Sequence, residues 1–191
     1  MKRPTPAIIR SSILQIAFER GPDKTLCPSE VARQLTAGTD TDPQTLMPAI
    51  RSAAAALWDQ GKIRVLQKGQ IVGINHVRGP IRLQIHKDPR PDRMPIDQIY
   101  NLGDVSRQHL ASVGIHTLGE LRRVGALAAF ESVMVHQMNL GVRRNLFHSM
   151  YLYALWSALH DVSCMQLPGS VKEQLKAMAA ACKESLLGKP D

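Results

Sequence analysis

The order of patterns between residues 27 and 69 constrains the fold of this 191-residue chain more than any other feature. The segment CPSEVARQL (27–35) has proline at a helix start and glutamate three residues after the cysteine, as in a capping box. The segment LMPAIRSAAAALWDQGK (46–62) has apolar residues at helical spacing and stops near a glycine. The segment IRVLQKG (63–69) then alternates apolar and other residues, which predicts a strand. Two helices are therefore followed directly by a basic β segment.

The flanking residues extend this order to a small domain. Four apolar residues at helical spacing predict a helix over 6–20 that ends before a Gly-Pro pair, namely Ile9, Ile13, Ile16 and Ala17. The third helix is expected over 45–60, a second strand over 81–85, and a connecting wing over 68–79. Three helices and a β-hairpin in this order predict a winged helix-turn-helix. Such domains commonly bind duplex DNA, and others serve as protein docking surfaces.

Charge is unevenly distributed along the chain, whose formal net charge is +8. Residues 1–93 carry 15 Lys/Arg against 8 Asp/Glu, whereas residues 94–191 carry 9 against 8. The first part is therefore the candidate for binding a polyanion, and DNA is the partner that we expect. A protein that uses charge only to stay in solution would show the same excess.

The expected hairpin supplies most of the candidate DNA contacts. Arg64, Lys68 and Arg82 should share its outer face, with Arg78 near the tip and Lys62 at the preceding turn. The third helix offers few groups that could reach base edges in a major groove. The complete set of candidate nucleic-acid-binding residues is Gln44, Arg51, Ser52, Lys62, Arg64, Lys68, Arg78 and Arg82. Four consecutive alanines at 53–56 also suit a helix interface, so a protein adaptor without DNA contact is the alternative.

Residues 6–86 resemble a bacterial winged-helix domain family of unknown function. The resemblance is carried by CPSEVAR (27–33), LMPAIRSAAAAL (46–57), GKIRVLQKG (61–69) and RGPIRL (78–83). It covers the whole first half and implies the fold, but it implies no activity.

The sequence divides into a winged-helix-like domain at 1–87, a proline-rich linker at 88–94 and a helical domain at 95–191. Prolines in and beside the linker forbid regular backbone hydrogen bonding, and its charges should keep it solvated. The rest of the chain is expected to be all-α. Its expected helices cover 96–101, 106–113, 118–124, 145–160 and 171–187.

Residues 95–180 resemble the C-terminal domain of the TfoX/Sxy family of competence regulators. The matching segments are NLGDVSRQHLASVGIHTLGELRRVGALAAF (101–130), LYALWSALHD (152–161) and LPGSVKEQL (167–175). The resemblance implies a helix-hairpin-helix-like domain in proteins of DNA uptake or its transcription regulation. TfoX-type regulators usually carry a different N-terminal domain, so the resemblance does not transfer the competence role to the whole chain.

The expected hairpin at 101–104 is poorly suited to phosphate. A helix-hairpin-helix binds DNA through backbone N–H groups at the start of its second helix. Here Asp104 stands where a phosphate would approach, and the hairpin lacks a second glycine. Arg107, Arg122 and Arg123 are the nearby cations. We therefore expect this half to pack or to bind a regulatory protein partner.

No arrangement of residues indicates catalysis, and we expect no enzyme activity, no cofactor and no metal. Cys27 is the exception to consider, because a thiol at a helix N-terminus can become reactive; an inert cap is the alternative. Three widely spaced cysteines fit a reducing cytoplasm, and no apolar run approaches the ~20 residues of a membrane span. The expectation is a cytoplasmic bacterial DNA-binding regulator with no membrane partner, whose oligomeric state the sequence does not indicate.

Overall fold

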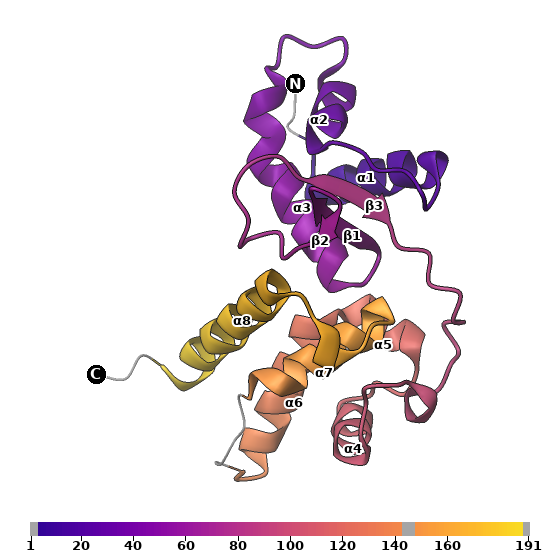
Figure 1. Ribbon diagram of the computed structural model, residues 1–191. Helices are drawn as coiled ribbons and strands as arrows, with labels where there is room; N and C mark the ends of the chain where they lie inside the picture. Colours follow the sequence, from indigo (N-terminus) through magenta and orange to yellow (C-terminus); the bar gives the residue numbers. More distant parts are fainter. Residues whose placement is uncertain (1–3, 143–147, 189–191) are drawn as a thin grey trace. The chain divides into compact units, whose positions relative to one another are not determined.

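The computed structural model describes residues 4–142 and 148–188, which form two compact units (Figure 1). The N-terminal unit comprises the described residues up to 58 together with 62–87, and the C-terminal unit comprises the others. The first unit combines helices with a small antiparallel sheet, and the second is all-α. This confirms the predicted fold class of a mainly α chain with a small β element in its first half.

Three helices frame the N-terminal unit: α1 (Pro6–Arg20), α2 (Pro28–Thr36) and α3 (Met47–Asp59), the last preceded by a 3-10 turn, η1 (Pro43–Leu46). The start of α2 is the predicted capping arrangement, since the backbone N–H of Cys27 donates to Oε1 of Glu30 at 2.9 Å. The third helix begins later than expected. Asp42 caps η1 by accepting the backbone N–H of Gln44, and this tighter turn replaces the first turn of the α-helix.

The sheet has three strands where the sequence predicted two. β1 (Ile63–Gln67) lies between β2 (Gln70–Ile71) and β3 (Arg82–Ile85), and both pairings are antiparallel. β2 was not expected because two residues are too few to show alternation. It forms because Lys68 and Gly69 both have positive φ, of 50° and 80°, as in the type I′ turn of a tight hairpin.

Leu26 joins the connection between α1 and α2 to the edge of this sheet. Its backbone exchanges two hydrogen bonds with Leu83 of β3, of 2.8 and 2.9 Å. The apolar core then fills the space between the helices and one face of the sheet. It includes the buried residues Ile9, Ile13, Val31, Ile50, Leu57, Trp58, Ile63, Val65 and Leu83. Each large side chain buried in this way contributes roughly 1.5–3 kcal/mol, so the core fixes which face of the sheet points outward.

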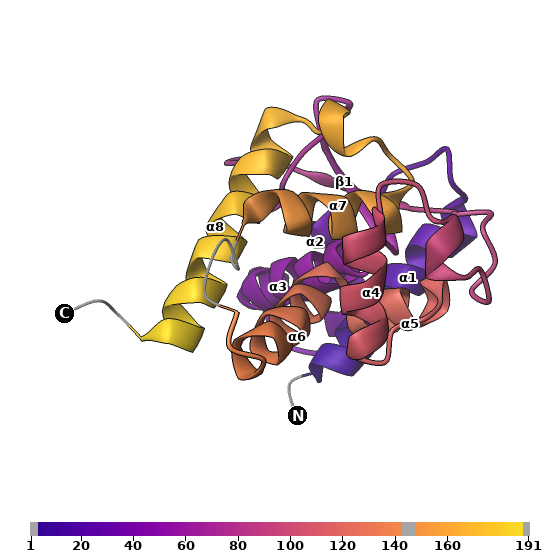
Figure 2. The ribbon, with the colours of Figure 1, turned by 90° about the horizontal axis from the view of Figure 1, so that it is seen from below.

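The C-terminal unit is built from five α-helices and two short 3-10 turns within the described residues. They are η2 (Ile96–Gln98), α4 (Asp104–Ser112), α5 (Leu118–Val124), α6 (Ala126–Asn139), α7 (Ser149–His160), η3 (Cys164–Gln166) and α8 (Gly169–Leu187). α6, α7 and α8 pack against one another, and α4 and α5 contact α6 (Figure 2). None of the helices that the structure describes is long and apolar enough to cross a membrane.

Two helix predictions in this unit need correction. α6 was not expected, although Ala126, Ala129, Phe130, Val133 and Met134 lie at helical spacing and are all buried. The helix expected over 96–101 is only the three-residue η2, because Asn101 has a φ of 77° and turns the chain away. The beginning of the helix expected over 145–160 lies outside the described residues, and α7 covers most of the remainder.

Residues 88–95, which we call the strap, are bound to the C-terminal unit. The Asp88 carboxylate pairs with Arg90 at 2.6 Å and with Arg122 of α5 at 2.7 Å. Only 5 % of the Asp88 side chain is exposed, so this charge is paired within the protein, whereas the Asp92 side chain is 76 % exposed. Arg90 also donates to the carbonyl oxygen of Ala158 at 2.7 Å, which connects the strap to α7.

The backbone of the strap is paired as well. The N–H groups of Leu118 and Gly119 donate to the carbonyl oxygens of Met94 and Asp92, each at 2.8 Å. Prolines cannot donate these bonds, but here the strap only accepts them. The proline-rich sequence therefore forms an ordered edge at the start of α5.

Candidate nucleic-acid interface

Strand register places two of the predicted contact residues on one face of the sheet. Arg64 pairs with Gln84, and Leu66 pairs with Arg82. Paired residues project to the same face, and neighbours along a strand alternate. Since Ile63, Val65 and Leu83 are buried in the core, Arg64 and Arg82 lie on the outer face, which points away from the helices.

Two further cations gather at the tip of the hairpin. Lys68 occupies the turn between β1 and β2, where it is exposed. The side-chain amide of Gln67, the preceding residue, donates to the carbonyl oxygen of Arg78 at 2.7 Å and to that of Pro80 at 3.4 Å. This contact holds the exposed Arg78 beside the turn. We call Arg64, Lys68, Arg78 and Arg82 the hairpin surface.

The hairpin surface has little local compensation for its charge. Residues 60–87 contain six Lys/Arg and no Asp/Glu. Glu30 of α2 approaches Arg82 at 3.8 Å, but it also pairs more closely with Arg20. In the part of the chain that the structure describes, Arg64, Lys68 and Arg78 form no salt bridge. Cations without acidic partners are what a phosphate backbone requires.

The remaining predicted contacts lie elsewhere in the unit. Lys62 is exposed before β1, at the opposite end of that strand from the hairpin turn. Gln44 in η1 and Ser52 in α3 are exposed. Arg51 is half-buried, and its guanidinium donates to the carbonyl oxygen of Ile74 at 3.2 Å. The guanidinium group of Arg51 therefore contacts the loop between β2 and β3.

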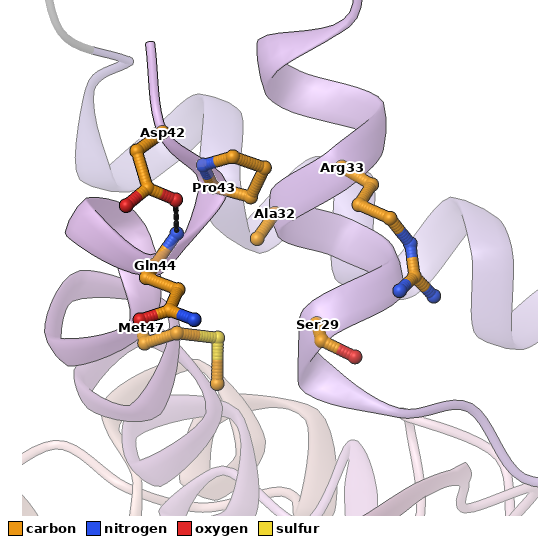
Figure 3. Close-up of a pocket in the computed structure, with 7 residues that line it drawn as sticks. All are labelled: Ser29, Ala32, Arg33, Asp42, Pro43, Gln44 and Met47. Carbon is orange, nitrogen blue, oxygen red and sulfur yellow. Dashed lines mark hydrogen bonds between the residues drawn. The ribbon is translucent and has the colours of Figure 1, made fainter.

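A pocket of about 580 Å³ lies between α2 and the start of α3 (Figure 3). Its lining comes from Ser29, Ala32 and Arg33 on one side and from Asp42, Pro43, Gln44 and Met47 on the other. Asp42 accepts the N–H of Gln44 at 2.9 Å, the bond drawn in Figure 3, and its side chain is exposed. Asp40 is exposed two residues earlier. The beginning of α3 thus carries negative charge, which opposes a phosphate.

The hairpin turn of the C-terminal unit has a structural role. The amide of Asn101 donates to the carbonyl oxygen of Val162 at 2.8 Å and accepts the N–H of Cys164 at 3.1 Å. Asp104 opens α4 with its side chain 88 % exposed, and it pairs with Arg107 at 3.1 Å. A carboxylate at this helix start repels phosphate and engages the nearest cation, so nothing here favours DNA.

A second pocket, of about 400 Å³, lies among α4, α6 and α7. Apolar residues around it are exposed, including Val105 at 64 % and Met150 at 43 %. Burial and the nearby charge of His136 lower the pKa of His109, so this imidazole is neutral at physiological pH. Burial also raises the pKa of the Tyr151 hydroxyl, which stays protonated. His109 and Tyr151 therefore add no charge to this pocket.

Two family models divide the chain between them. Residues 93–179 match the TfoX C-terminal domain. Residues 6–86 match a family described as protein of unknown function (DUF3253). Both matches agree with the resemblances seen in the sequence, and the TfoX C-terminal domain relates the second unit to a family of competence regulators. No curated protein matches the chain.

Neither the C-terminal unit nor the N-terminal unit shows a metal-binding cluster of three His, Cys, Asp or Glu residues within the ranges that the structure describes. Cys27, which the sequence singled out, is half-buried at the start of α2 and accepts a hydrogen bond from the hydroxyl of Ser29 at 3.0 Å. Cys182 is buried in α8, where burial and the charge of Glu131 raise the pKa of its thiol to about 11. A thiol with so high a pKa is largely protonated at neutral pH.

Proposed function

We propose that this chain is a non-catalytic DNA-binding regulator whose N-terminal unit acts as a winged helix-turn-helix on duplex DNA. The observation that supports the proposal is the hairpin surface, where four cations lie on and beside the exposed face of the sheet. Cations that neutralise phosphates release bound counterions, and this release supplies much of the affinity for duplex DNA. The absence of acidic residues from 60–87 leaves that contribution largely uncancelled.

The regulatory part of the proposal rests on the C-terminal unit. Its match to the TfoX C-terminal domain relates it to competence regulators. Because the start of α4 presents Asp104, DNA binding is assigned to the N-terminal unit alone. The C-terminal unit would then bind a regulatory protein partner, and the two units together would bring that partner to DNA.

Charge reversal at the hairpin tip tests the DNA-binding proposal. The double variant Lys68→Glu, Arg78→Glu should abolish retardation of a duplex in a gel at low salt. Both side chains are exposed and neither forms a salt bridge with any residue that the structure describes, so the thermal unfolding midpoint should change little. The matched control is Lys176→Glu, Lys183→Glu, which makes the same change in net charge at exposed positions of α8. Equal retardation by the hairpin variant and the wild type would eliminate the proposal.

The pocket of the C-terminal unit favours a second candidate, a protein adaptor with no direct DNA contact. Val105 and Met150 expose apolar surface around a pocket that is large enough for partner side chains. Binding through such a surface is insensitive to salt because no ion pairs are involved. Retention of a defined partner at high salt, its loss in Val105→Glu, Met150→Glu, and no DNA retardation at low salt would support the adaptor over the DNA-binding protein.

A further inference from the structure

We infer, on the basis of the DNA binding proposed above, that the N-terminal unit binds the phosphate backbone of duplex DNA through the hairpin surface. In this arrangement α3 does not read the bases. The ligand is then any B-form duplex, independent of its sequence. This differs from the usual arrangement in a helix-turn-helix, where the helix after the turn enters the major groove and reads base edges.

The exposed side of α3 lacks groups that can discriminate bases. Pro48, Ala49 and Ser52 are its exposed residues in the first turns, and none is charged. Specific readout relies mainly on the bidentate hydrogen bonds of Arg, Lys, Asn and Gln side chains. The arginine of α3, Arg51, already donates to the carbonyl oxygen of Ile74. A helix with this surface can discriminate bases only weakly.

Negative charges at the start of α3 also oppose insertion of this helix into the major groove of DNA. Asp40 and Asp42 are exposed immediately before the helix, and Asp42 forms part of the pocket in Figure 3. Insertion of α3 would bring these carboxylates close to the phosphates that line the groove. Like charges brought this close repel one another. Segment 60–87, with its six Lys/Arg and no Asp/Glu, has the opposite character.

The hairpin surface is suited to backbone contact because its parts are fixed. Arg64 and Arg82 project from the outer face of a paired sheet, and the turn that carries Lys68 has a tight hairpin geometry. Gln67 fixes the backbone at Arg78. Contacts to phosphate oxygens position a protein on DNA and carry no sequence information of their own. Four such cations therefore predict tight binding at low salt with little preference among duplexes.

The experiment compares two double variants of the full-length chain that each lower its net charge by two units. Lys68→Gln, Arg78→Gln alters the hairpin surface, and Ala49→Glu, Ser52→Glu alters the exposed face of α3. Fluorescence anisotropy would measure binding to three 24-base-pair duplexes of unrelated sequence over a salt series. Thermal unfolding would verify that each variant is folded.

We expect the wild type to bind the three duplexes with affinities within about threefold of one another, since phosphate contacts dominate. The hairpin variant should bind at least tenfold more weakly, and its plot of log affinity against log salt should be shallower by about 1.8, corresponding to two lost phosphate contacts. The α3 variant should bind within about threefold of the wild type. These results together would support backbone binding by the hairpin surface.

Two other outcomes separate the inference from the function on which it rests. If the wild type prefers one duplex by more than tenfold, or if the α3 variant loses binding while remaining folded, DNA binding stands and the inference is overturned. If the wild type binds none of the duplexes at low salt, both the inference and the DNA-binding function fail.

Discussion

Arg51 of α3 donates a hydrogen bond to the carbonyl oxygen of Ile74 across 3.2 Å. The side chain of Ile74 is fully buried, so the loop after β2 is held at this point by both its backbone and its side chain. The same loop continues to Arg78, whose carbonyl oxygen is held by Gln67 at the other end. Two hydrogen bonds therefore fix the segment that supplies one cation of the hairpin surface.

Arg51 should contribute to stability and not to DNA binding. In Arg51→Ala the half-buried carbonyl of Ile74 loses a charged donor, so we expect the N-terminal unit to lose about 1.5–3 kcal/mol. Hydrogen exchange of its slowest amides measures this loss. Arg33→Ala, at an exposed position of α2, is the control and should change stability by less than about 0.5 kcal/mol. A shallower salt dependence of DNA binding in Arg51→Ala would instead identify this residue as a phosphate contact.

The positions of two of the four cations of the hairpin surface could be predicted from the sequence, for a physical reason. Alternation in a strand decides which side chains share a face, so the placement of Arg64 and Arg82 follows from the apolar residues between them. The orientation of the Arg51 side chain does not follow from helical spacing, because the group that accepts its hydrogen bond is a backbone carbonyl 23 residues later in the chain. Nothing in a sequence pattern marks a carbonyl oxygen as an acceptor for a distant side chain.

Gln67 should act on DNA binding through the position of Arg78. Gln67→Ala removes the two hydrogen bonds that hold the segment at Arg78 and Pro80. Each is worth about 1 kcal/mol, so DNA affinity should fall by up to about thirtyfold, the equivalent of about 2 kcal/mol. The slope of the salt dependence should stay unchanged, since no charge is lost. Gln70→Ala, at an exposed position of β2, should bind like the wild type. If the slope of the salt dependence changes in Gln67→Ala, Gln67 does not act by positioning Arg78.

The strap shows where composition misleads. Two prolines within 88–94, a third at Pro95 and several charges indicated a solvated linker, but Asp88 pairs with Arg90 and with Arg122 of α5. Composition gives the number of charges and cannot give their partners. The one local hint was Gly119, which allows a close approach at the start of α5. A Cβ at that position would lie 2.7 Å from Cβ of Asp92 and 2.9 Å from its carbonyl oxygen.

Gly119→Ala should therefore displace the strap. The new methyl group would collide with the backbone of Asp92, which cannot move without losing its bond from the N–H of residue 119. We expect a loss of about 1–3 kcal/mol, the usual range for overpacking. Mass-spectrometric hydrogen exchange should show faster exchange in α5. Gly169→Ala is the matched control because nothing lies within 4 Å of its Cβ. Equal protection of α5 in both variants would show that the strap is not required there.

Asp88 should make the C-terminal unit sensitive to acid. Burial alone would raise the pKa of this carboxyl, but hydrogen bonds and charge from Arg90 and Arg122 outweigh it and hold the pKa well below its ordinary value. Above about pH 4 the carboxylate is charged in both the folded and the unfolded chain, and its full contribution to stability is present. As the pH falls below 4, the unfolded chain takes up a proton that the folded chain resists, and the contribution is progressively lost.

Comparison with Asp88→Asn isolates this effect, since the amide does not titrate in this range. The variant leaves two half-buried arginines without their shared carboxylate, so we expect it to be less stable by about 3 kcal/mol at pH 7. The difference between wild type and variant should stay constant from pH 7 to 5 and shrink below about pH 4. Urea unfolding of the C-terminal unit at each pH, followed by circular dichroism, measures it. A difference that does not change down to pH 3 would mean that Asp88 is not the source of acid sensitivity.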